Sequence, residues 1–280
     1  MSEKFTVTQL QRLAELNGDT GCGEMEFADA GTRNKAFMNM EKELTEENRK
    51  ALSSFLGSGH ITAAVKAEND LTGWLTDEEG FSKVSTPIMI PGEYLDRMTI
   101  TKDHALREQV FWVGKNKCMR PMLAPNLYIV MRELHKITGG PVKIFECGSC
   151  FRKESQGAMH MNEFTMLNLV ELAGTEEGKQ SERLEGFAHD AMKAVGIDKY
   201  DIVKEKSEVY GETLDIVADG VEIASGAYGP MALDAPWGIF DVWVGIGLGI
   251  ERIAMIKGEY KNIKRVGKST TFVDGIPLKL

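Results

Sequence analysis

The spacing of apolar residues along the chain changes from a helical period to a strand-like one. Between residues 4 and 56, and again from residue 61 to about 79, apolar residues recur every three or four positions, which predicts two mostly helical stretches. The segment "LGSGH" at 56–60 separates these stretches, and Gly80 ends the second. From about residue 109 onward, short apolar runs bounded by glycine and polar residues predict strands with helical interruptions.

The predicted strands are joined mainly by hairpins. Strands are expected at 81–91, 109–114, 141–154 and 163–172, in a hairpin turning at Asp219 and Gly220, and in a glycine-rich run from Trp243. Helices are expected at about 123–140 and 178–195 and directly after the glycine-rich strand. These elements predict an α+β fold, an antiparallel sheet flanked by helices, with residues 61–280 as the main domain and residues 1–60 as a short helical N-terminal extension. Pro87 places the first strand at an edge or an interface.

Composition and charge limit the class of protein, its expected location and its expected partners. The 280 residues are 42% hydrophobic and 27% charged, as is usual for a folded globular protein. No apolar run approaches the roughly 20 residues that span a bilayer, and the N-terminal residues lack the apolar core of a signal peptide, so we expect a cytoplasmic protein without a membrane partner. The net charge of −9 argues against broad adhesion to nucleic acid. A basic stretch at 257–268 remains either a solvated surface or a local nucleic-acid contact.

Cys147 and Cys150 have the C-x-x-C spacing of a redox pair or of half a zinc site. The other cysteines, Cys22 and Cys118, have no nearby histidine or cysteine to complete a tetrahedral zinc site. Residues three apart in a regular strand point to opposite faces, so we interpret Cys147 and Cys150 as ordinary strand residues. Two resemblances to phosphate-binding loops also fail, because "GKST" at 267–270 lacks the first P-loop glycine and "GIGLGI" lacks the dinucleotide-binding spacing.

The same alternation places Arg152 and Glu154 together on one strand face, with Phe164 on the returning strand. Arginine grips phosphates or carboxylates through paired hydrogen bonds, glutamate accepts from an amine, and an aromatic ring stacks on a base. These residues suit a nucleotide bound on the sheet, although a surface ion pair beside a core phenylalanine would give the same pattern.

Glycines dominate one face of the strand that precedes the last helix. Gly245, Gly247 and Gly249 share this face, and Glu251 and Arg252 follow at the start of the helix. The pattern indicates either close approach of a ligand to the backbone or close packing of another element.

In this order, Pro87 after a long helix, "FRKE" followed by "EFTMLN", and "GIGLGIER" resemble the three motifs of class II aminoacyl-tRNA synthetases. The stretches "RPMLAPNLYIVMREL", "VYGETLDI" and "GPMALDAPWGI" narrow the resemblance to the catalytic domain of pyrrolysyl-tRNA synthetases, over roughly residues 85–280. The resemblance implies a ligase that uses ATP to activate pyrrolysine as an aminoacyl-adenylate and transfers it to its cognate tRNA. It also implies a homodimer, and it leaves room for a separate tRNA-binding protein. Two alternatives stay open: another phenylalanine-like class II synthetase, and a non-catalytic paralogue that binds RNA.

By position in the motifs, the resemblance implies roles at the nucleotide site. Arg152 would contact the α-phosphate and the amino-acid carboxylate, Glu154 the adenine amine, and Arg252 the γ-phosphate. These three are the candidate catalytic residues, and ATP is expected to contact Arg152, Glu154, His160, Phe164, Glu222, Gly249 and Arg252. Mg²⁺ is expected at Glu222 and Ser225, where it would bridge phosphate oxygens.

Helical spacing gives Ala124, Leu127, Tyr128 and Met131 one shared apolar face, which is either ordinary core or one wall of a pocket. The resemblance favours the pocket and extends the expected lining to Asn168, Val170, Tyr210, Ser225, Ala227, Trp243 and Gly245. Such a tunnel suits a lysine whose ε-amine carries an apolar ring, because a free ammonium would be desolvated without a partner. Asn168 would hydrogen-bond the side-chain amide, and Tyr210 would cap the ring.

Overall fold

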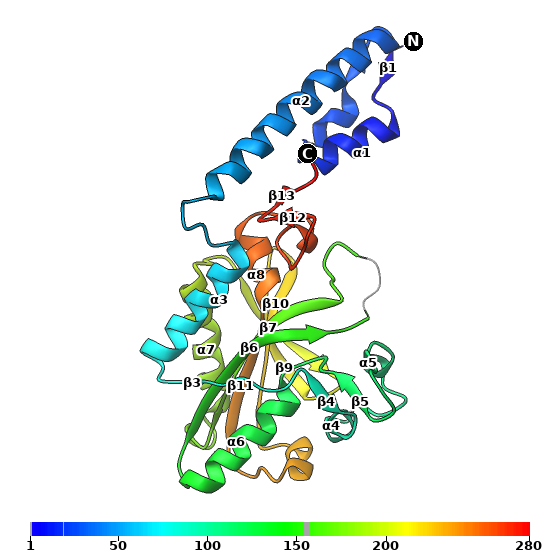
Figure 1. Ribbon diagram of the computed structural model, residues 1–280. Helices are drawn as coiled ribbons and strands as arrows, with labels where there is room; N and C mark the ends of the chain where they lie inside the picture. Colours follow the sequence, from blue (N-terminus) through cyan, green and yellow to red (C-terminus); the bar gives the residue numbers. More distant parts are fainter. Residues whose placement is uncertain (1, 19, 154–156) are drawn as a thin grey trace. The chain divides into compact units, whose positions relative to one another are not determined.

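The computed structural model describes residues 2–18, 20–153 and 157–280, and it divides into two compact units. Residues 1–62 and 269–280 make up the first unit, and residues 63–268 make up the second. Figure 1 labels the elements of both. The expected domains at 1–60 and 61–280 stay a prediction. No described helix is long and apolar enough to cross a membrane.

Helices dominate the first unit, as the sequence predicts. Helix α1 (Val7–Glu15) begins after Thr6, whose side chain accepts a hydrogen bond from the third residue of the helix, and α2 (Ala30–Phe55) begins after Asp29 in the same way. The remaining elements are short: β1 (Glu3–Lys4), η1 (Thr20–Glu24), β2 (Glu26–Phe27), β12 (Phe272–Val273) and β13 (Ile276–Pro277). The buried core of this unit consists of Phe5, Leu13, Cys22 and Phe27.

The second unit begins with helix α3 (Ala63–Gly73) and a π-helical turn, η2 (Trp74–Glu78). Gly80 ends this segment with a φ of +71°, a conformation that glycine adopts without steric cost. The helix predicted from residue 61 to about 79 is therefore confirmed. Two short helices follow later, α4 (Glu93–Arg97) and α5 (Ala105–Glu108).

The strand predicted over 81–91 is wrong. Two short strands, β3 (Ser82–Lys83) and β4 (Met89–Pro91), take its place and belong to different sheets. Between them, Thr86 donates its N–H to the side chain of Glu146 instead of a neighbouring strand, and Pro87 has no N–H to donate.

The strand predicted over 109–114 is also wrong. This stretch makes a single bridge, between Trp112 and Cys118, and the strand β5 (Lys117–Met119) begins after it. β5 pairs with β4 in a sheet of only two strands. Residues 109–114 therefore lie next to a short sheet and do not form a regular strand of their own.

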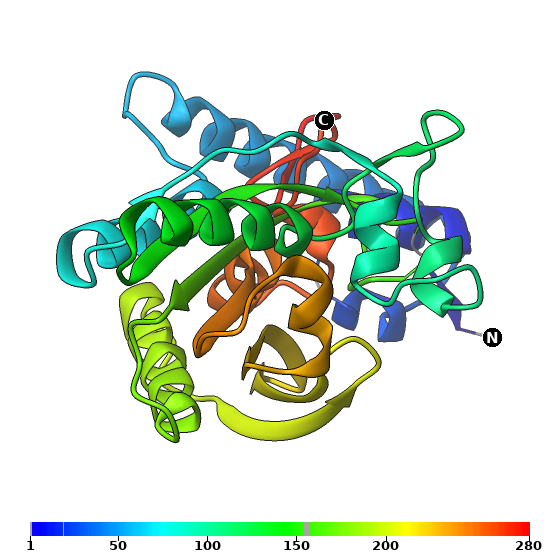
Figure 2. The same cartoon turned by 90° about the horizontal axis from the view of Figure 1, so that it is seen from below.

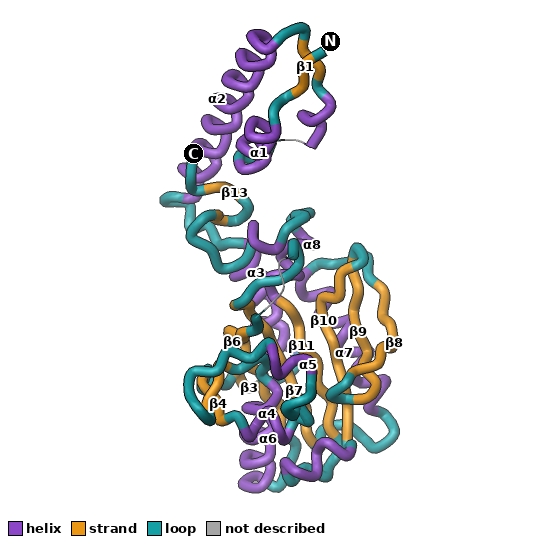
Figure 3. Tube along the Cα trace, turned by 90° about the vertical axis from the view of Figure 1, so that its right-hand side faces the viewer, coloured by secondary structure: helices purple, strands orange, loops and turns teal. Residues whose placement is uncertain are grey.

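A seven-stranded sheet forms the centre of the second unit (Figures 1 and 3). Its order is β3-β6-β7-β11-β10-β9-β8, and every neighbouring pair except β3-β6 is antiparallel, which confirms the predicted sheet type. The longer strands are β6 (Val142–Phe151), β7 (Glu163–Leu172), β8 (Asp201–Ser207), β9 (Gly211–Ala218), β10 (Val221–Gly229) and β11 (Trp243–Gly249). The sequence did not predict β8, because this edge strand carries mostly exposed polar residues.

Helices cover both faces of the sheet (Figure 2). One face packs against α3, α7 (Gln180–Val195) and α8 (Ile250–Lys257). The other face packs against α4, α6 (Ala124–Thr138) and the 3-10 helix η3 (Ala232–Trp237). The helices predicted at 123–140, at 178–195 and after the glycine-rich strand are confirmed. We call these two sides the α7 face and the α6 face.

Strand alternation separates the two cysteines of β6. Cys147 packs in the hydrophobic cluster of the α7 face, whereas Cys150 is buried in the cluster of the α6 face. Burial raises the pKa of both thiols, that of Cys150 to about 12. The prediction that these two cysteines lie on opposite faces of the strand is therefore confirmed.

Candidate functional site

Two adjoining cavities lie on the α6 face, where β7, β10 and β11 run side by side. The empty space of the inner chamber is about 490 Å³ and that of the outer chamber about 1270 Å³, counting the solvent at their open mouths. Ala124, Asn168, Tyr210, Ser225 and Gly247 line both cavities. The two chambers therefore meet at these residues.

Every residue predicted for the amino-acid pocket lines the inner chamber: Ala124, Leu127, Tyr128, Met131, Asn168, Val170, Tyr210, Ser225, Ala227, Trp243 and Gly245. Helix α6 supplies the first four at one-turn spacing, and its start is preorganised by Pro125. The structure thus brings these residues together, while their roles stay predictions. Other parts of the lining were not predicted from the sequence, namely Leu169, Thr213, Gly226, Ile246 and Gly247.

Three aromatic side chains form much of the inner wall. The rings of Tyr128 and Trp243 meet edge to face with centroids 5.8 Å apart, and Tyr210 lies 6.4 Å from Trp243. Burial raises the pKa of both tyrosines, so their hydroxyls stay neutral at ordinary pH. None of the described residues that line this chamber is charged. The chamber is therefore a neutral, largely apolar cavity.

Asn168 is the main polar group between the two chambers. Its Oδ1 is buried and accepts no hydrogen bond from any described part of the chain. A side chain at Gly247 would place its Cβ 3.0 Å from Asn168 Nδ2 and 3.1 Å from Oδ1, so glycine leaves room for the amide. A buried acceptor without a partner is costly, which favours a ligand that donates a hydrogen bond at this position.

The outer chamber contains the residues predicted for nucleotide binding, namely Arg152, His160, Phe164, Glu222, Gly249 and Arg252. Glu154 lies outside the described residues. Arg152 donates from Nε to the carbonyl of Pro121 at 2.9 Å, and its guanidinium lies 5.3 Å from the ring centroid of Phe164. A cation and an aromatic face are therefore adjacent in this chamber, as the strand alternation predicts.

Arg252 provides a second cation in the outer chamber. It donates from Nη1 to the carbonyl of Glu222 at 2.7 Å, and the Glu222 carboxylate lies 3.6 Å away. The residue before it, Glu251, is buried and accepts the N–H of Thr165 with both carboxylate oxygens, at 3.0 and 2.8 Å. Glu251 thus ties the start of α8 to β7 and holds Arg252 at the chamber.

A β-bulge brings Glu222 and Ser225 to the same face of β10. These residues are three apart, and regular alternation would point them to opposite faces. The register shifts between Glu222 and Ala224, so that Glu222 pairs with Val217 and Ser225 pairs with Asp215. The extra residue, Ile223, is buried in the cluster of the α7 face. Glu222 and Ser225 therefore both line the outer chamber.

The oxygen atoms around this bulge suit a hard cation. Ser225 donates its hydroxyl to Asp215 at 2.6 Å, and Glu222 lies next along the same face. Although its side chain is half exposed, the loss of solvent around the Glu222 carboxylate raises its pKa; Arg252 opposes this shift and Asp215 adds to it. No cluster of three or more His, Cys, Asp or Glu suited to a metal occurs among the residues described. Mg²⁺ commonly uses one or two protein oxygens together with substrate phosphates, so this donor set fits a metal that arrives with a nucleotide.

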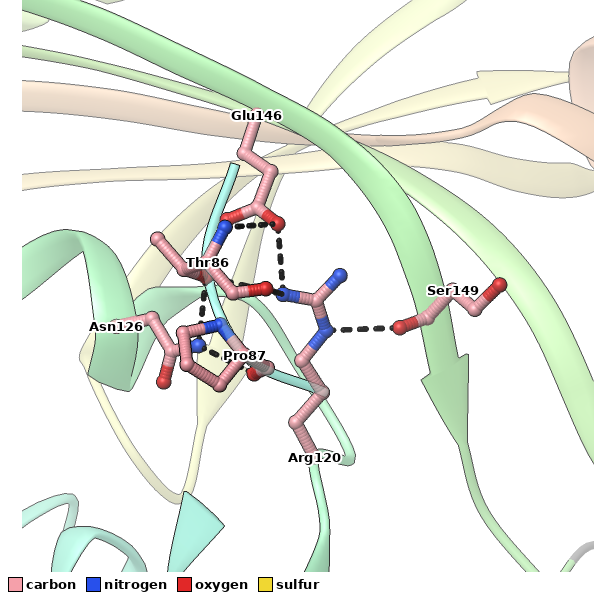
Figure 4. A network of polar contacts seen from close by, with 6 residues as sticks. All are labelled: Thr86, Pro87, Arg120, Asn126, Glu146 and Ser149. Atoms are coloured by element: carbon pink, nitrogen blue, oxygen red, sulfur yellow. Dashed lines mark hydrogen bonds and ion pairs between the residues drawn. The ribbon is translucent and has the colours of Figure 1, made fainter. Parts of the chain in front are cut away.

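A buried ion pair joins β6 to the segment before α6 (Figure 4). Arg120 and Glu146 are both 2% exposed, and their closest atoms are 2.7 Å apart. Thr86 donates its N–H and its hydroxyl to Glu146, and Arg120 donates to the carbonyl of Ser149 at 2.8 Å. A Cβ on Gly148 would collide with the Arg120 guanidinium, so glycine is required there. This network was not predicted from the sequence.

The basic stretch at 257–268 packs beside the tip of the β6–β7 hairpin. Ile263, in the short helix η4 (Ile263–Arg265), donates its N–H to the carbonyl of Ala158 at 2.8 Å. Lys268 contacts the hydroxyl of Ser149 and the carboxylate of Glu163. Part of this stretch therefore holds the hairpin, while Lys257, Lys261 and Lys264 are exposed.

Comparisons with known proteins agree with this architecture. The family model described as "tRNA synthetases class II core domain (F)" matches residues 52–274. A crystal structure of the pyrrolysyl-tRNA synthetase from Desulfitobacterium hafniense is 44% identical, covers all of this chain and all of its own, and gives a TM-score of 0.89. A second pyrrolysyl-tRNA synthetase structure from that organism is 43% identical, covers all of this chain and 96% of its own, and gives a TM-score of 0.87.

Curated relatives match over shorter stretches. The lysine–tRNA ligase of Syntrophomonas wolfei is 34% identical over 103 residues, which is 36% of this chain and 18% of that ligase. The O-phosphoserine–tRNA(Cys) ligase of Methanocorpusculum labreanum is 26% identical over 165 residues, 53% of this chain and 30% of that ligase. The chain therefore spans less than a third of the length of these two relatives.

Proposed function

The chain belongs to the family of class II tRNA synthetases, and we propose that it activates pyrrolysine with ATP and attaches it to its cognate tRNA. In the first step, the amino-acid carboxylate attacks the α-phosphorus of ATP, and pyrophosphate leaves. In the second, a terminal ribose hydroxyl of the tRNA attacks the acyl carbon, and AMP leaves. Both steps depend on positioning and on stabilising the charge that develops.

The observation that carries this proposal is the neutral inner chamber that ends at an unsatisfied amide. Asn168 Oδ1 accepts no hydrogen bond from the described residues. A secondary amide on a lysine ε-nitrogen would supply the missing N–H donor. The aromatic wall of Tyr128, Tyr210 and Trp243 suits the apolar ring beyond that amide. Free lysine would bury its ammonium without a carboxylate to pair with.

We assign the outer chamber to ATP. Arg152 would hold the α-phosphate and the amino-acid carboxylate, because it lines the cavity that Asn168 also lines and its guanidinium lies 5.3 Å from the Phe164 ring. Phe164 would stack on the adenine, and Arg252 would hold the γ-phosphate, with His160 and the backbone at Gly249 also in reach. The role of Glu154 in reading the adenine amine stays a prediction. Glu222 and Ser225 would hold Mg²⁺, which supplies charge neutralisation at the phosphates.

Two partners complete the proposal. A tRNA would be contacted by the exposed lysines of the basic stretch, Lys257, Lys261 and Lys264, and a separate protein would supply further tRNA binding. A second copy of the chain would cover Ile88 and Met89, the exposed apolar residues that follow Pro87, and the exposed Val113. Gel filtration at rising concentration tests the dimer, and a monomer throughout would reject it.

Amino-acid-dependent exchange of pyrophosphate into ATP tests the activity. Pyrrolysine or a ring-bearing N-ε-acyl-lysine should support exchange, and lysine, phenylalanine and phosphoserine should not. Comparable exchange with lysine would contradict the pocket assignment. Arg152→Ala should lower exchange by about 100-fold or more. Cys147→Ser, on the opposite face of the same strand, is the matched control and should keep nearly full exchange.

The relatives that use other amino acids do not favour a different substrate. A phosphoserine pocket needs cationic side chains, and none of the described residues in the inner chamber is cationic. A non-catalytic RNA-binding role predicts loss of the motif residues, yet Arg152, Glu154 and Arg252 are all present. Charging of total tRNA with pyrrolysine would separate the ligase from such a paralogue.

A further inference from the structure

Asp234 is a carboxylate that is buried behind the aromatic wall of the inner chamber. It lies in η3 with none of its surface exposed. Within the described ranges, no lysine, arginine or histidine forms an ion pair with it. Burying a carboxylate is costly unless several donors compensate. The donors around Asp234 therefore indicate what the residue is for.

Two of these donors are wall residues of the inner chamber. Tyr128 donates its hydroxyl to Oδ1 at 2.8 Å, and Trp243 donates its indole N–H to Oδ2 at 2.7 Å. The third donor, the backbone N–H of Met231, binds Oδ2 at 2.7 Å. Tyr128 comes from helix α6 and Trp243 from strand β11, so a single carboxylate joins two walls that are far apart in the sequence.

The surrounding backbone is shaped to keep this arrangement. A Cβ on Gly229 would collide with the Trp243 indole nitrogen and lie 2.6 Å from Asp234 Oδ2. Trp237, also in η3, packs on Tyr128 with ring centroids 5.3 Å apart. The carboxylate, the two rings and the glycine thus form one close-packed group.

We propose that Asp234 is a specificity-determining positioning residue, which fixes the Tyr128 and Trp243 rings and thereby sets the width of the amino-acid pocket. The inference rests on the proposed function of the inner chamber and extends it to a residue that no substrate touches. This role explains why a carboxylate lies behind the wall of a neutral pocket. A carboxylate only accepts hydrogen bonds, so it can bind all three of the donors that converge on it. Bonds from neutral donors to a charged acceptor are stronger than neutral pairs, so both rings are held in one orientation.

The variant Asp234→Asn tests this role with little change in volume. Its amide has one acceptor oxygen, so the NH₂ group faces either the Tyr128 hydroxyl, whose oxygen can accept from it, or the N–H groups of Trp243 and Met231, which cannot. In either orientation the bonds to a charged acceptor are replaced by weaker neutral bonds or lost, so the two rings are held less firmly. In pyrophosphate exchange, the KM for a ring-bearing N-ε-acyl-lysine should rise about tenfold, and the KM for ATP should change less than about twofold. The preference for a ring-bearing over a small acyl group should fall. Asp198→Asn, the same change at an exposed position, should alter none of these values.

A second readout is independent of activity. The chain has four tryptophans, so the indole N–H signals of ¹⁵N-labelled protein can be assigned with a Trp243→Phe variant. The Trp243 signal should move in Asp234→Asn and stay in Asp198→Asn. If the wild type activates no N-ε-acyl-lysine, the proposed function fails, while a moved signal still supports the anchoring of the ring.

Several results would overturn the inference. These are an unchanged substrate preference in Asp234→Asn, equal rises in the KM values for amino acid and ATP, or an unmoved Trp243 signal. If Asp234→Asn does not fold, Tyr128→Phe decides, because it keeps the ring and removes one bond to the carboxylate. It should weaken the preference for the ring-bearing substrate, and an unchanged preference would reject the inference.

Discussion

Replacing Arg120 with methionine should strongly destabilise the second unit, because it leaves the Glu146 carboxylate buried without its cation. The two side chains are each 2% exposed and 2.7 Å apart. Arg120 also donates to the carbonyl and hydroxyl of Thr86, at 3.2 and 3.0 Å, and to the carbonyl of Ser149 at 2.8 Å. The variant removes all of these bonds at once (Figure 4).

The expected cost follows from burial. Removing one partner of a buried ion pair typically costs about 3–5 kcal/mol, since the remaining charge is uncompensated. Glu146 still accepts the N–H of Thr86 at 3.1 Å and its hydroxyl at 2.5 Å. These two remaining bonds keep the expected loss of stability within that range. A unit of about 200 residues loses about 2–4 °C of melting temperature per kcal/mol, so Tm should fall by about 10 °C.

Equilibrium unfolding in urea and thermal melts would measure this loss. The double variant Arg120→Met/Glu146→Gln should be more stable than the sum of the two single losses predicts, because it also removes the buried, unpaired Glu146 charge. Lys66→Met removes an exposed cation that pairs with Asp70 and should cost less than about 1 kcal/mol. A loss below about 1 kcal/mol in Arg120→Met, or additive losses in the double variant, would refute the reasoning.

Three further predictions concern single residues of the chambers. Asn168→Ala should raise the KM for an N-ε-acyl-lysine about tenfold in pyrophosphate exchange and leave the KM for ATP nearly unchanged; an equal effect on both would contradict the amide contact. Gly247→Ala should displace the Asn168 amide, which lies 3.0 Å from the new Cβ, and weaken amino-acid binding in a titration calorimeter, whereas Gly186→Ala has open space and should not. Burial raises the pKa of Glu251 above 4.5, so the folded state disfavours its charge, and this penalty grows as pH rises from the unfolded pKa and levels off above the folded pKa. Glu251→Gln keeps an acceptor for Thr165, and its Tm relative to wild type should therefore increase between pH 4 and pH 7; a constant difference would reject the assignment.

Strand alternation predicted much of the site, because residues 142–151 of β6 pair with residues 163–172 of β7 without a bulge. In an uninterrupted hairpin, sequence parity alone assigns each side chain to a face. Arg152 and Phe164 were placed correctly in this way, and Cys147 and Cys150 were separated correctly. The pocket-facing side of α6 was predicted equally well, since its apolar residues recur at regular helical spacing.

Parity failed wherever the backbone bonds to something other than a neighbouring strand. The N–H of Thr86 binds the Glu146 carboxylate, which interrupted the strand predicted over 81–91. Arg120 and Asp234 were missed for a related reason. Their partners lie far away in the sequence, at Glu146 and at Tyr128, and only the assembled fold brings them together.

The bulge at Ile223 has a consequence for how this hairpin tolerates change. Residues before and after it each alternate regularly, but the two alternations are out of phase by one position. Deleting Ile223 would restore a single phase, and the pairs Glu222–Val217 and Ser225–Asp215 would keep both side chains on the chamber face. What the deletion would remove is one apolar side chain from the cluster of the α7 face. The extra residue therefore serves the hydrophobic core behind the sheet, and its loss should lower stability more than it alters the nucleotide chamber.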